Sequence, residues 1–290
     1  MSRRAKCFFL VLFFFMLWIV PSGALADYSG ILSFGDSLTS DNGGSGSSSY
    51  GTYSNGPVWV QDLATMWAVS LTDQAVGGAT TAPIPGDAAS NTNNVAYQIA
   101  NYSPGVSLTD TLVTVWAGGN DVTAYLALNQ LTTMAQIIAT ANASADNVFN
   151  DVQTLANEGF KNFLVPDLPN LGLTTRFYGT PYQAPLTAWC TVFDQELAAD
   201  LIKLIAANPG DNFYTADAYG LLAAVFADPT AYGFANDAAI FWTDGYHPSA
   251  QTQQFFANSV AEMYTPLPAP LLLLGSGLIG LAGVRRRFKN

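Results

Sequence analysis

Short apolar runs bounded by turn residues alternate with segments of helical periodicity through most of this chain. The clearest strand-like runs are residues 30–34 and 111–116, and apolar residues recur at helical spacing from Pro57 to Trp67. The pattern predicts further strands at residues 73–76, 162–166 and 212–215, and further helices at 145–157, 184–207 and 249–264, the last capped by Ser249. Strands that alternate with helices favour an α/β fold of three layers, α/β/α, around a mostly parallel sheet.

The first 26 residues follow a different pattern. Three basic residues precede an apolar run over residues 8–20, and the small-residue sequence Ala24-Leu25-Ala26 follows it. This order is typical of a secretory signal peptide. We therefore expect residues 1–26 to be a signal peptide that signal peptidase removes after Ala26.

Residues 266–290 also have the pattern of a targeting segment. An apolar run over residues 271–284, interrupted only by Ser276, leads into a basic cluster at 285–289. Counted from Leu267, the apolar stretch is near the lower limit of roughly 17 residues for a transmembrane helix, and the positive-inside rule keeps the basic flank in the cytoplasm. A C-terminal membrane anchor is one interpretation of this segment.

The same segment resembles the PEP-CTERM sorting signals of Gram-negative bacteria. Pro266-Leu267-Pro268-Ala269 matches the Pro-Leu-Pro-Ala variant of their motif, and a Gly/Leu-rich run and an arginine cluster follow it. The resemblance implies processing by an exosortase-type protease, a transient anchor in the inner membrane, and arrival at the cell surface or outside the cell. Both interpretations place the middle of the chain outside the cytoplasm.

Residues 27–265 form a single stretch whose size suits one α/β domain. Only Lys161, Arg176 and Lys203 are basic there, whereas all twenty-one acidic residues of the chain lie in it, so its formal charge is near −18. Proteins that bind nucleic acid need Lys and Arg to contact the phosphates. We therefore do not expect nucleic acid to be a partner of this protein.

Cys190 is the only cysteine of this stretch, because Cys7 lies in the signal peptide, and an internal disulfide is therefore impossible. Its apolar neighbours favour a buried thiol over a reactive thiol or an intermolecular disulfide. One histidine and one cysteine are too few ligands for a zinc site. Calcium bound by carboxylates is left open as an alternative, but no EF-hand loop occurs. We expect no metal and no cofactor.

Three residues carry the candidate chemistry. His247 is the only histidine of the chain, Asp244 precedes it by three positions, and Ser37 follows the first expected strand. A serine hydroxyl is a poor nucleophile until a base takes its proton, and imidazole is suited to that exchange near neutral pH. Asp244 can accept a hydrogen bond from the other ring nitrogen and fix the tautomer. These residues predict a Ser37-His247-Asp244 catalytic triad.

Turns of unusual composition follow the first three expected strands, at Asp36-Ser37, Gly77-Gly78 and Gly118-Gly119-Asn120-Asp121. The carboxyl ends of parallel strands share one edge of a sheet, so these turns are expected to line one crevice. Glycine there lets the backbone approach a substrate or adopt a positive φ. The chain contains no Gly-x-Ser-x-Gly sequence, which argues against the nucleophile elbow of the α/β-hydrolase fold.

Four blocks, in this order, resemble the GDSL, or SGNH, hydrolase family across residues 30–264. The blocks are Phe34-Gly35-Asp36-Ser37-Leu38, Ala75-Val76-Gly77-Gly78-Ala79-Thr80-Thr81, Gly118-Gly119-Asn120-Asp121 and Asp244-Gly245-Tyr246-His247-Pro248. The resemblance implies a flavodoxin-like SGNH-hydrolase fold. It also implies an oxyanion hole formed by the N–H groups of Ser37 and Gly78 and the side-chain amide of Asn120. Asp36 and Asp121 are then expected to support the site. The sequence Asp41-Asn42-Gly43 after the first block resembles the secreted esterase and lecithinase branch.

The function expected from these features is an exported serine esterase or lipase that cleaves carboxylic esters. Short-chain acyl esters, lysophospholipids and acetylated sugars all stay open as substrates. The sorting tail favours a surface polymer, for which the protein would be a polysaccharide O-acetylesterase. Four aromatic residues are expected either to line an acyl pocket or to lie in the core: Tyr50, Tyr53, Trp59 and Trp116.

Three other functions are compatible with parts of the sequence. Transfer of the acyl group to an alcohol would make the protein an acyltransferase. A surface module that binds carbohydrate or lipid could retain the fold without the chemistry, and a structural matrix protein would need only the acidic surface and the tail. Neither of the last two needs Ser37, Asn120, Asp244 and His247 together, so the hydrolase is preferred.

Overall fold

Five parallel strands form the sheet of the computed structural model, which describes residues 28–41 and 53–264. The strands are β1 (Gly30–Gly35), β2 (Ser70–Asp73), β3 (Thr111–Trp116), β4 (Asn162–Leu164) and β5 (Asn212–Tyr214). They lie in the order β2-β1-β3-β4-β5, and all neighbours pair in parallel. The order reverses between β1 and β3, and ligands of doubly wound sheets bind at such a switch point.

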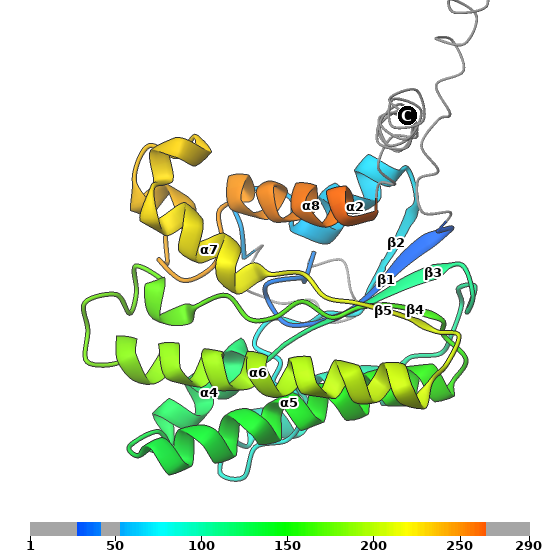
Figure 1. The fold of residues 1–290 in the computed structure, drawn as a ribbon, viewed down its shortest axis with the longest axis horizontal. Helices are drawn as coiled ribbons and strands as arrows, with labels where there is room; N and C mark the ends of the chain where they lie inside the picture. Colours follow the sequence, from blue (N-terminus) through cyan, green and yellow to red (C-terminus); the bar gives the residue numbers. More distant parts are fainter. Residues whose placement is uncertain (1–27, 42–52, 265–290) are drawn as a thin grey trace, which may run out of the picture. The chain divides into compact units, whose positions relative to one another are not determined.

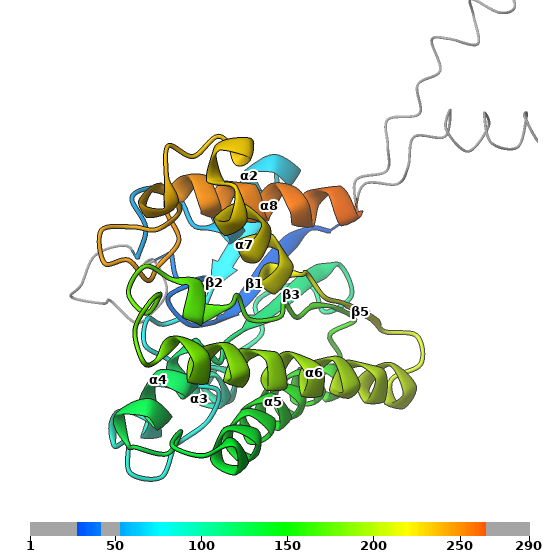
Figure 2. The same ribbon diagram turned by 60° about the vertical axis from the view of Figure 1, so that its left-hand side comes forward.

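Helices cover both faces of this sheet (Figure 1). One layer contains α2 (Trp59–Trp67), α7 (Ala218–Ala227) and α8 (Ala250–Tyr264). The other contains α3 (Val95–Asn101), α4 (Gly119–Ala127), α5 (Met134–Asn157) and α6 (Gln183–Ala207), and α5 and α6 lie side by side in both views (Figures 1 and 2). Short 3₁₀ helices occupy Ala89–Asn91, Leu171–Leu173, Pro229–Tyr232 and Asp237–Ile240. The predicted three-layer α/β/α fold with a parallel sheet is confirmed.

Aromatic side chains fill the space between the sheet and the first helix layer. Every residue of β1 and β3 is buried, as expected for central strands covered on both faces. The Trp116 ring at the end of β3 lies 4.6 Å from Phe256 of α8 and 5.6 Å from Trp59 of α2, between centroids. Trp59 and Trp116 are therefore core residues.

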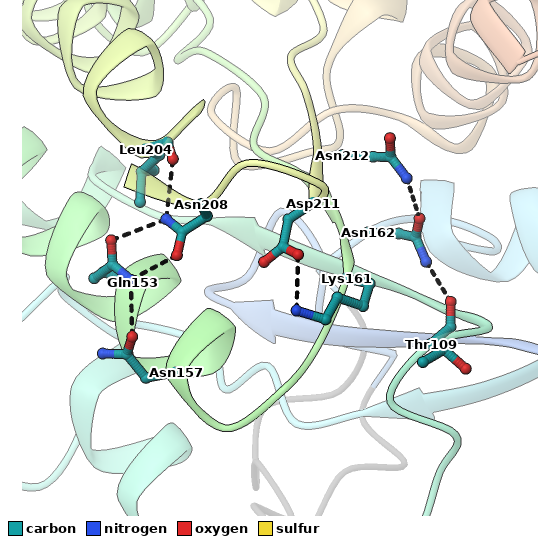
Figure 3. A network of polar contacts seen from close by, with 9 residues as sticks. All are labelled: Thr109, Gln153, Asn157, Lys161, Asn162, Leu204, Asn208, Asp211 and Asn212. Carbon is teal, nitrogen blue, oxygen red and sulfur yellow. Dashed lines mark hydrogen bonds and ion pairs between the residues drawn. The ribbon is translucent and has the colours of Figure 1, made fainter. Parts of the chain in front are cut away.

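Polar side chains tie together the segments that enter β4 and β5 (Figure 3). Lys161 donates to Asp211 over 2.8 Å, and the Asn212 amide donates to Oδ1 of Asn162 over 2.8 Å. The amide of Asn162 in turn donates to the carbonyl of Thr109 over 2.7 Å. This network lies at the amino ends of the strands, so it stabilises the edge of the sheet opposite the predicted crevice.

The expected position of the second strand is wrong by three residues, because β2 occupies Ser70–Asp73 and not residues 73–76. The Asp73 carboxylate accepts hydrogen bonds from Ser33 Oγ and from the N–H groups of Asp41 and Ala75. These side-chain contacts end the regular strand. The other four strands lie where the apolar runs place them, although β4 ends at Leu164 and not at Pro166.

The helices differ more from expectation than the strands do. The helix expected at residues 145–157 begins at Met134, where Thr133 and Gln136 form a capping box. Exposed apolar side chains in its first turns, including Met134 and Ile138, obscure the helical period there. Helices α3, α4 and α7 were not predicted. In particular, α4 begins at Gly119, so Asn120 and Asp121 lie in a helical first turn.

Residues 28–260 form one unit by their internal contacts, and this unit contains the whole sheet. The signal peptide expected at residues 1–26 and the tail expected at 266–290 lie outside the described residues, as do Asn42, Gly43 and Tyr50. Across residues 28–41 and 53–264, no helix combines the length and the apolar character needed to cross a bilayer.

Candidate active site

Ser37 lies in the tight turn that follows β1. The strand ends at Gly35, where φ is +151° and a Cβ atom would collide with the carbonyl oxygen of Trp116, so only glycine fits. The amide of Gln98 donates to the Gly35 carbonyl over 2.8 Å and accepts from its N–H over 3.0 Å. Directly after Ser37, the N–H of Leu38 donates to Oδ1 of the Asp36 carboxylate over 2.9 Å. These contacts fix the backbone that presents Ser37.

His247 faces Ser37 although 210 positions separate the two residues. Its Nε2 lies 2.8 Å from Ser37 Oγ, and its Nδ1 makes a short hydrogen bond with Oδ2 of Asp244. The other oxygen of Asp244 accepts from the N–H groups of Tyr246, over 2.9 Å, and of His247, over 3.0 Å. The structure therefore brings the three predicted residues together, with the imidazole between the hydroxyl group and the carboxylate that orients it.

The charge state of Asp244 follows from opposing effects. Partial burial acts to raise the pKa of its carboxyl group, but the hydrogen bonds from the His247 ring and from two backbone N–H groups act more strongly together. The pKa of Asp244 is consequently held below its usual value. A carboxylate thus faces the ring nitrogen remote from Ser37, which favours the tautomer that leaves Nε2 free to accept a proton.

Two aromatic rings hold the imidazole in place. The Tyr53 ring lies 4.9 Å from the His247 ring between centroids, and the Tyr246 ring lies 5.1 Å away at nearly a right angle. Tyr53 packs against Gly77 so closely that a Cβ atom there would collide with the phenol. Gly77 is therefore needed for the approach of Tyr53 to the imidazole.

Gly78 and Asn120, the two other predicted oxyanion donors, line the same cleft as Ser37 and His247. Gly78 has a φ of +80°, which turns the chain sharply after β2. The preceding carbonyl, that of Gly77, accepts a hydrogen bond from Nδ2 of Asn93 over 3.1 Å. The turn is therefore held from outside the cleft.

The amide of Asn120 already has protein partners. Its Nδ2 donates to Oδ2 of Asp36 over 3.2 Å and to the carbonyl oxygen of Ala79 over 3.0 Å. The first contact links Asn120 to the residue that precedes the serine. The second must be exchanged if Asn120 is to donate to a bound oxyanion, because an amide nitrogen has two hydrogens.

Asp36 and Asp121 are buried carboxyl groups behind the cleft. Burial raises the pKa of Asp36 to about 7, although the hydrogen bonds from Leu38 and Asn120 act to lower this pKa. Burial likewise raises the pKa of Asp121 to about 6. Asp121 accepts from the N–H and hydroxyl of Thr81, over 2.9 and 2.6 Å, and from Ser144 Oγ over 2.9 Å. It thereby ties the turn after β2 to α4 and α5.

The cleft in front of Ser37 has a volume of about 980 Å³. Apolar side chains from α4 and from the segment before α6 alternate in its wall with polar ones. The residues beyond the predicted set that line it include Thr123, Leu126, Asn129, Leu131, Arg176, Phe177, Tyr182 and Pro185. Such a volume matches the upper range for small-molecule sites.

Two sites considered for other chemistry have simpler explanations. Cys190 is fully buried on α6, and burial raises the pKa of its thiol to about 12, so the thiol is inert. Carboxylate oxygens of Asp146, Glu196 and Asp200 lie within 4.8 Å of one another on α5 and α6. The ammonium of Lys203 donates to Asp200 over 2.6 Å and to Glu196 over 3.4 Å, so this cluster already contains a positive charge.

Four residues of the site were not singled out from the sequence: Gln98, Arg176, Phe177 and Tyr246. A buried glutamine within a helix has no recognisable signal, because its partners at Gly35 are distant in sequence. Arg176 did have one signal, since it is the only arginine between residues 27 and 265. Tyr246 lies inside a recognised block, between Asp244 and His247, but its packing could not be known.

Comparison with known proteins identifies the family of this chain. The model of the GDSL-like Lipase/Acylhydrolase family matches residues 31–260. Solved structures with a similar fold include a lipase from a goat rumen metagenome, which is 16% identical with a TM-score of 0.48 over 80% of this chain and 95% of the lipase. They include phospholipase A1 from Streptomyces albidoflavus NA297, 18% identical with a TM-score of 0.46 over 82% of this chain and 100% of that protein. An acetylxylan esterase from Geobacillus stearothermophilus is 16% identical, with a TM-score of 0.47 over 83% of this chain and 95% of the esterase.

At these identities the likeness to solved structures concerns the fold alone. A comparison with curated proteins finds no match to this chain. The family match, by contrast, extends from β1 into α8 and includes all four sequence blocks. The chain therefore belongs to the GDSL-like lipase/acylhydrolase family and is a carboxylic ester hydrolase.

Proposed function

We propose that this protein is an exported serine hydrolase that cleaves carboxylic esters through an acyl-enzyme formed on Ser37. The observation that carries the proposal is the 2.8 Å hydrogen bond between Ser37 Oγ and His247 Nε2, with Asp244 on the opposite ring nitrogen. A nucleophile, a base and a carboxylate that orients the base are the parts that activate a hydroxyl group.

The reaction proceeds in two halves. In the first, Ser37 Oγ attacks the ester carbonyl while His247 takes the hydroxyl proton, and the ester C–O bond breaks as His247 returns that proton to the leaving alcohol. In the second, a water molecule gives its proton to His247 and attacks the acyl group. The carboxylic acid leaves and Ser37 recovers its proton. Asp244 stabilises the imidazolium in both halves.

The oxyanion of each tetrahedral intermediate accepts hydrogen bonds from the backbone of Ser37 and Gly78 and from the Asn120 amide. All three residues line the cleft. Asn120 exchanges its hydrogen bond with the Ala79 carbonyl for one with the oxyanion, while Asp36 retains the other hydrogen. Removing one such donor typically lowers turnover about a hundredfold to a thousandfold.

We also propose that the chain reaches the cell exterior. The basis is the sequence pattern of residues 1–26 and 266–290, which predicts removal of the signal peptide by signal peptidase and of the tail by an exosortase-type protease. Expression of the full chain in a Gram-negative host that encodes such a protease tests this. The expected intact mass corresponds to a chain that begins at Asp27 and ends near Pro266. An unprocessed chain in the cytoplasm would contradict export.

Ester hydrolysis by the purified protein tests the chemistry. We expect turnover of p-nitrophenyl acetate or butyrate, with loss of at least about a thousandfold in Ser37→Ala and in His247→Ala. Ser29→Ala is a matched control, because Ser29 is exposed next to the opposite end of β1. Its activity should equal that of the wild type. Folded Ser37→Ala protein that retains wild-type turnover would exclude Ser37 as the nucleophile.

A further inference from the structure

Arg176 is a cation without a counter-charge in an acidic protein. Residues 27–265 contain three basic side chains and twenty-one acidic ones. Lys161 pairs with Asp211, and Lys203 pairs with Glu196 and Asp200. Within residues 28–41 and 53–264, Arg176 makes no ion pair, and its guanidinium donates no hydrogen bond. Its five N–H donors are therefore available to a ligand.

This cation lies in the wall of the catalytic cleft. Arg176 lines the cleft together with Ser37 and His247. Its guanidinium carbon lies 5.7 Å from the centroid of the Tyr246 ring, and that ring meets His247 at 5.1 Å. One aromatic ring thus separates the guanidinium from the base.

The position of Arg176 is fixed by two kinds of contact. Its backbone N–H donates to the carbonyl of Gly245 over 2.9 Å, which links it to the loop that carries His247. Its guanidinium also lies 5.5 Å from the centroid of the Phe177 ring. Contacts with two aromatic faces hold an arginine side chain without using its hydrogen-bond donors. The donors are therefore left unused by the described residues, on a side chain that is exposed and lines the cleft.

The rest of the cleft wall lacks negative charge. Of the described residues that line it, none is Asp or Glu, although acidic residues outnumber basic ones sevenfold in the domain. The carboxylates of Asp244 and Asp36 are occupied by hydrogen bonds behind His247 and Asn120. Asp87 lines a neighbouring hollow and not the cleft itself, and its Oδ1 accepts from the N–H of Ala89. Among the described residues that line the cleft, Arg176 is therefore the one Lys, Arg, Asp or Glu that a substrate meets.

On the proposed esterase function, we propose that the substrate carries an anionic group and that Arg176 binds it. The class is an ester whose acyl or alcohol part carries a carboxylate or a phosphate, placed so that the anion reaches Arg176 when the ester carbonyl lies at Ser37. Guanidinium binds both anions through paired hydrogen bonds. Arg176 is thus a specificity-determining residue of the cleft.

Matched pairs of anionic and neutral esters test this inference. Mono-p-nitrophenyl glutarate is compared with the p-nitrophenyl ester of glutaramic acid, and 3-acetoxybenzoate with 3-acetoxybenzamide. A third pair, 3-acetoxyphenyl phosphate and its neutral dimethyl ester, distinguishes phosphate from carboxylate. The quantity measured is the ratio of kcat/KM for the anionic ester to that for its neutral partner, in the full-length protein and in Arg176→Gln.

In at least one pair, we expect Arg176→Gln to lower this ratio about threefold to tenfold, as for a partly exposed charge-assisted hydrogen bond. Arg176→Lys should retain part of the ratio, and added salt should reduce the ratio of the wild type. Lys161→Gln is the matched control. It changes the net charge equally, but Lys161 pairs with Asp211 (Figure 3) and directly precedes β4, at the amino ends of the strands, so the ratio should not change.

The outcomes separate this inference from the proposed function. If the wild type hydrolyses the neutral esters but Arg176→Gln leaves the ratio of every pair unchanged, the anion-binding role of Arg176 is wrong and the esterase mechanism stands. An equal fall of the ratio in Lys161→Gln would show that the effect comes from the overall charge of the protein, and it would also overturn the anion-binding role of Arg176. If the folded wild type hydrolyses none of the six esters, the proposed function itself fails.

Discussion

Oδ2 of Asp36 lies 3.2 Å from Nδ2 of Asn120, so the residue that precedes the proposed nucleophile, Ser37, holds the amide that we propose as an oxyanion donor. The other oxygen of Asp36 accepts from the N–H of Leu38 over 2.9 Å, on the far side of Ser37. One buried carboxyl group therefore positions both the serine turn and the Asn120 side chain.

Asp36→Asn is expected to impair catalysis while preserving the fold. The amide oxygen of the new asparagine would accept from the N–H of Leu38, so the NH₂ group of the new side chain would face the NH₂ group of Asn120. Two donors that face each other repel. We expect kcat on p-nitrophenyl acetate to fall about tenfold to a hundredfold, less than complete loss of a donor, with a smaller change in KM. Asp110→Asn, at an exposed turn, serves as the control. Unchanged kcat in Asp36→Asn would show that Asp36 does not position Asn120.

Gly78→Ala and Gly159→Ala form a pair that separates backbone strain from catalysis. Both glycines have positive φ, +80° and +106°, and an added Cβ at either would meet a side-chain atom at 3.3 Å. The left-handed conformation should cost each variant about 1–2 kcal/mol of stability. Only Gly78 lies in the cleft, so only Gly78→Ala should lower kcat as well. Urea unfolding and ester hydrolysis measure the two effects. Equal kcat in both variants would show that the N–H of Gly78 is not an oxyanion donor.

The sequence was most informative where local chemistry decides local structure. Strands β1 and β3 consist of uninterrupted buried residues, and their positions follow directly from the apolar runs. The blocks around Ser37, Gly78 and Asn120 lie at strand ends, so the parallel sheet was sufficient to predict that they share a crevice. His247 had no competitor as the base because the chain has one histidine.

Long-range contacts decided the features that could not be predicted. The amide of Gln253 donates to the carbonyl of Leu38 over 3.3 Å and its oxygen accepts from Trp59, links that join α8 and α2 to the serine turn. The end of β2 depends on how Asp73 meets Ser33 and Asp41. The periodicity of one segment cannot predict these hydrogen-bond partners, because each partner comes from a distant segment that packs against it.

The buried carboxyl groups predict a fold that becomes more stable as the pH falls. Burial raises the pKa of Asp36 and Asp73 to about 7, that of Asp121 and Asp167 to about 6, and that of Asp194 to about 8. Between pH about 4 and about 8 the folded protein therefore binds more protons than the unfolded chain, whose carboxyl groups titrate near 4. Stability is fully present below that range and is lost as the pH rises through it. Asp244, with its lowered pKa, acts in the opposite direction, but only below pH about 4.

Asp194→Asn tests this pH dependence at one position. Oδ1 of Asp194 accepts from the N–H of Leu168 over 2.8 Å, a bond that asparagine can keep, and Oδ2 has no hydrogen-bond partner among the described residues. We expect the urea midpoint of the wild type to be higher at pH 5.5 than at pH 8, and Asp194→Asn to reduce that difference by stabilising the protein at pH 8. The exposed Asp237→Asn should leave the difference unchanged. A wild-type midpoint that rises with pH over this range would refute the assignment.

Tyr246 separates the catalytic cleft from a small apolar cavity between α7, α8 and the end of β3, and lines both. The cavity has a volume of about 40 Å³, and its wall includes Leu222, Phe241 and Phe256. Removal of the Tyr246 ring would join the two spaces and add an apolar extension beside Ser37. Tyr246→Ala is therefore expected to raise the ratio of kcat/KM for p-nitrophenyl palmitate to that for the butyrate, because a longer acyl chain gains apolar contact.

Two further variants separate this effect from a loss of packing. Tyr246→Phe removes only the hydrogen bond from the phenol to the Gly119 carbonyl, 3.2 Å long, and should cost about 1 kcal/mol of stability without changing the chain-length ratio. Leu222→Phe, added to Tyr246→Ala, should refill the cavity and return the ratio toward that of the wild type. A folded Tyr246→Ala variant whose ratio equals that of the wild type would show that other residues besides Tyr246 keep the acyl chain out of the apolar cavity. The preference for acyl-chain length would then be determined elsewhere in the cleft.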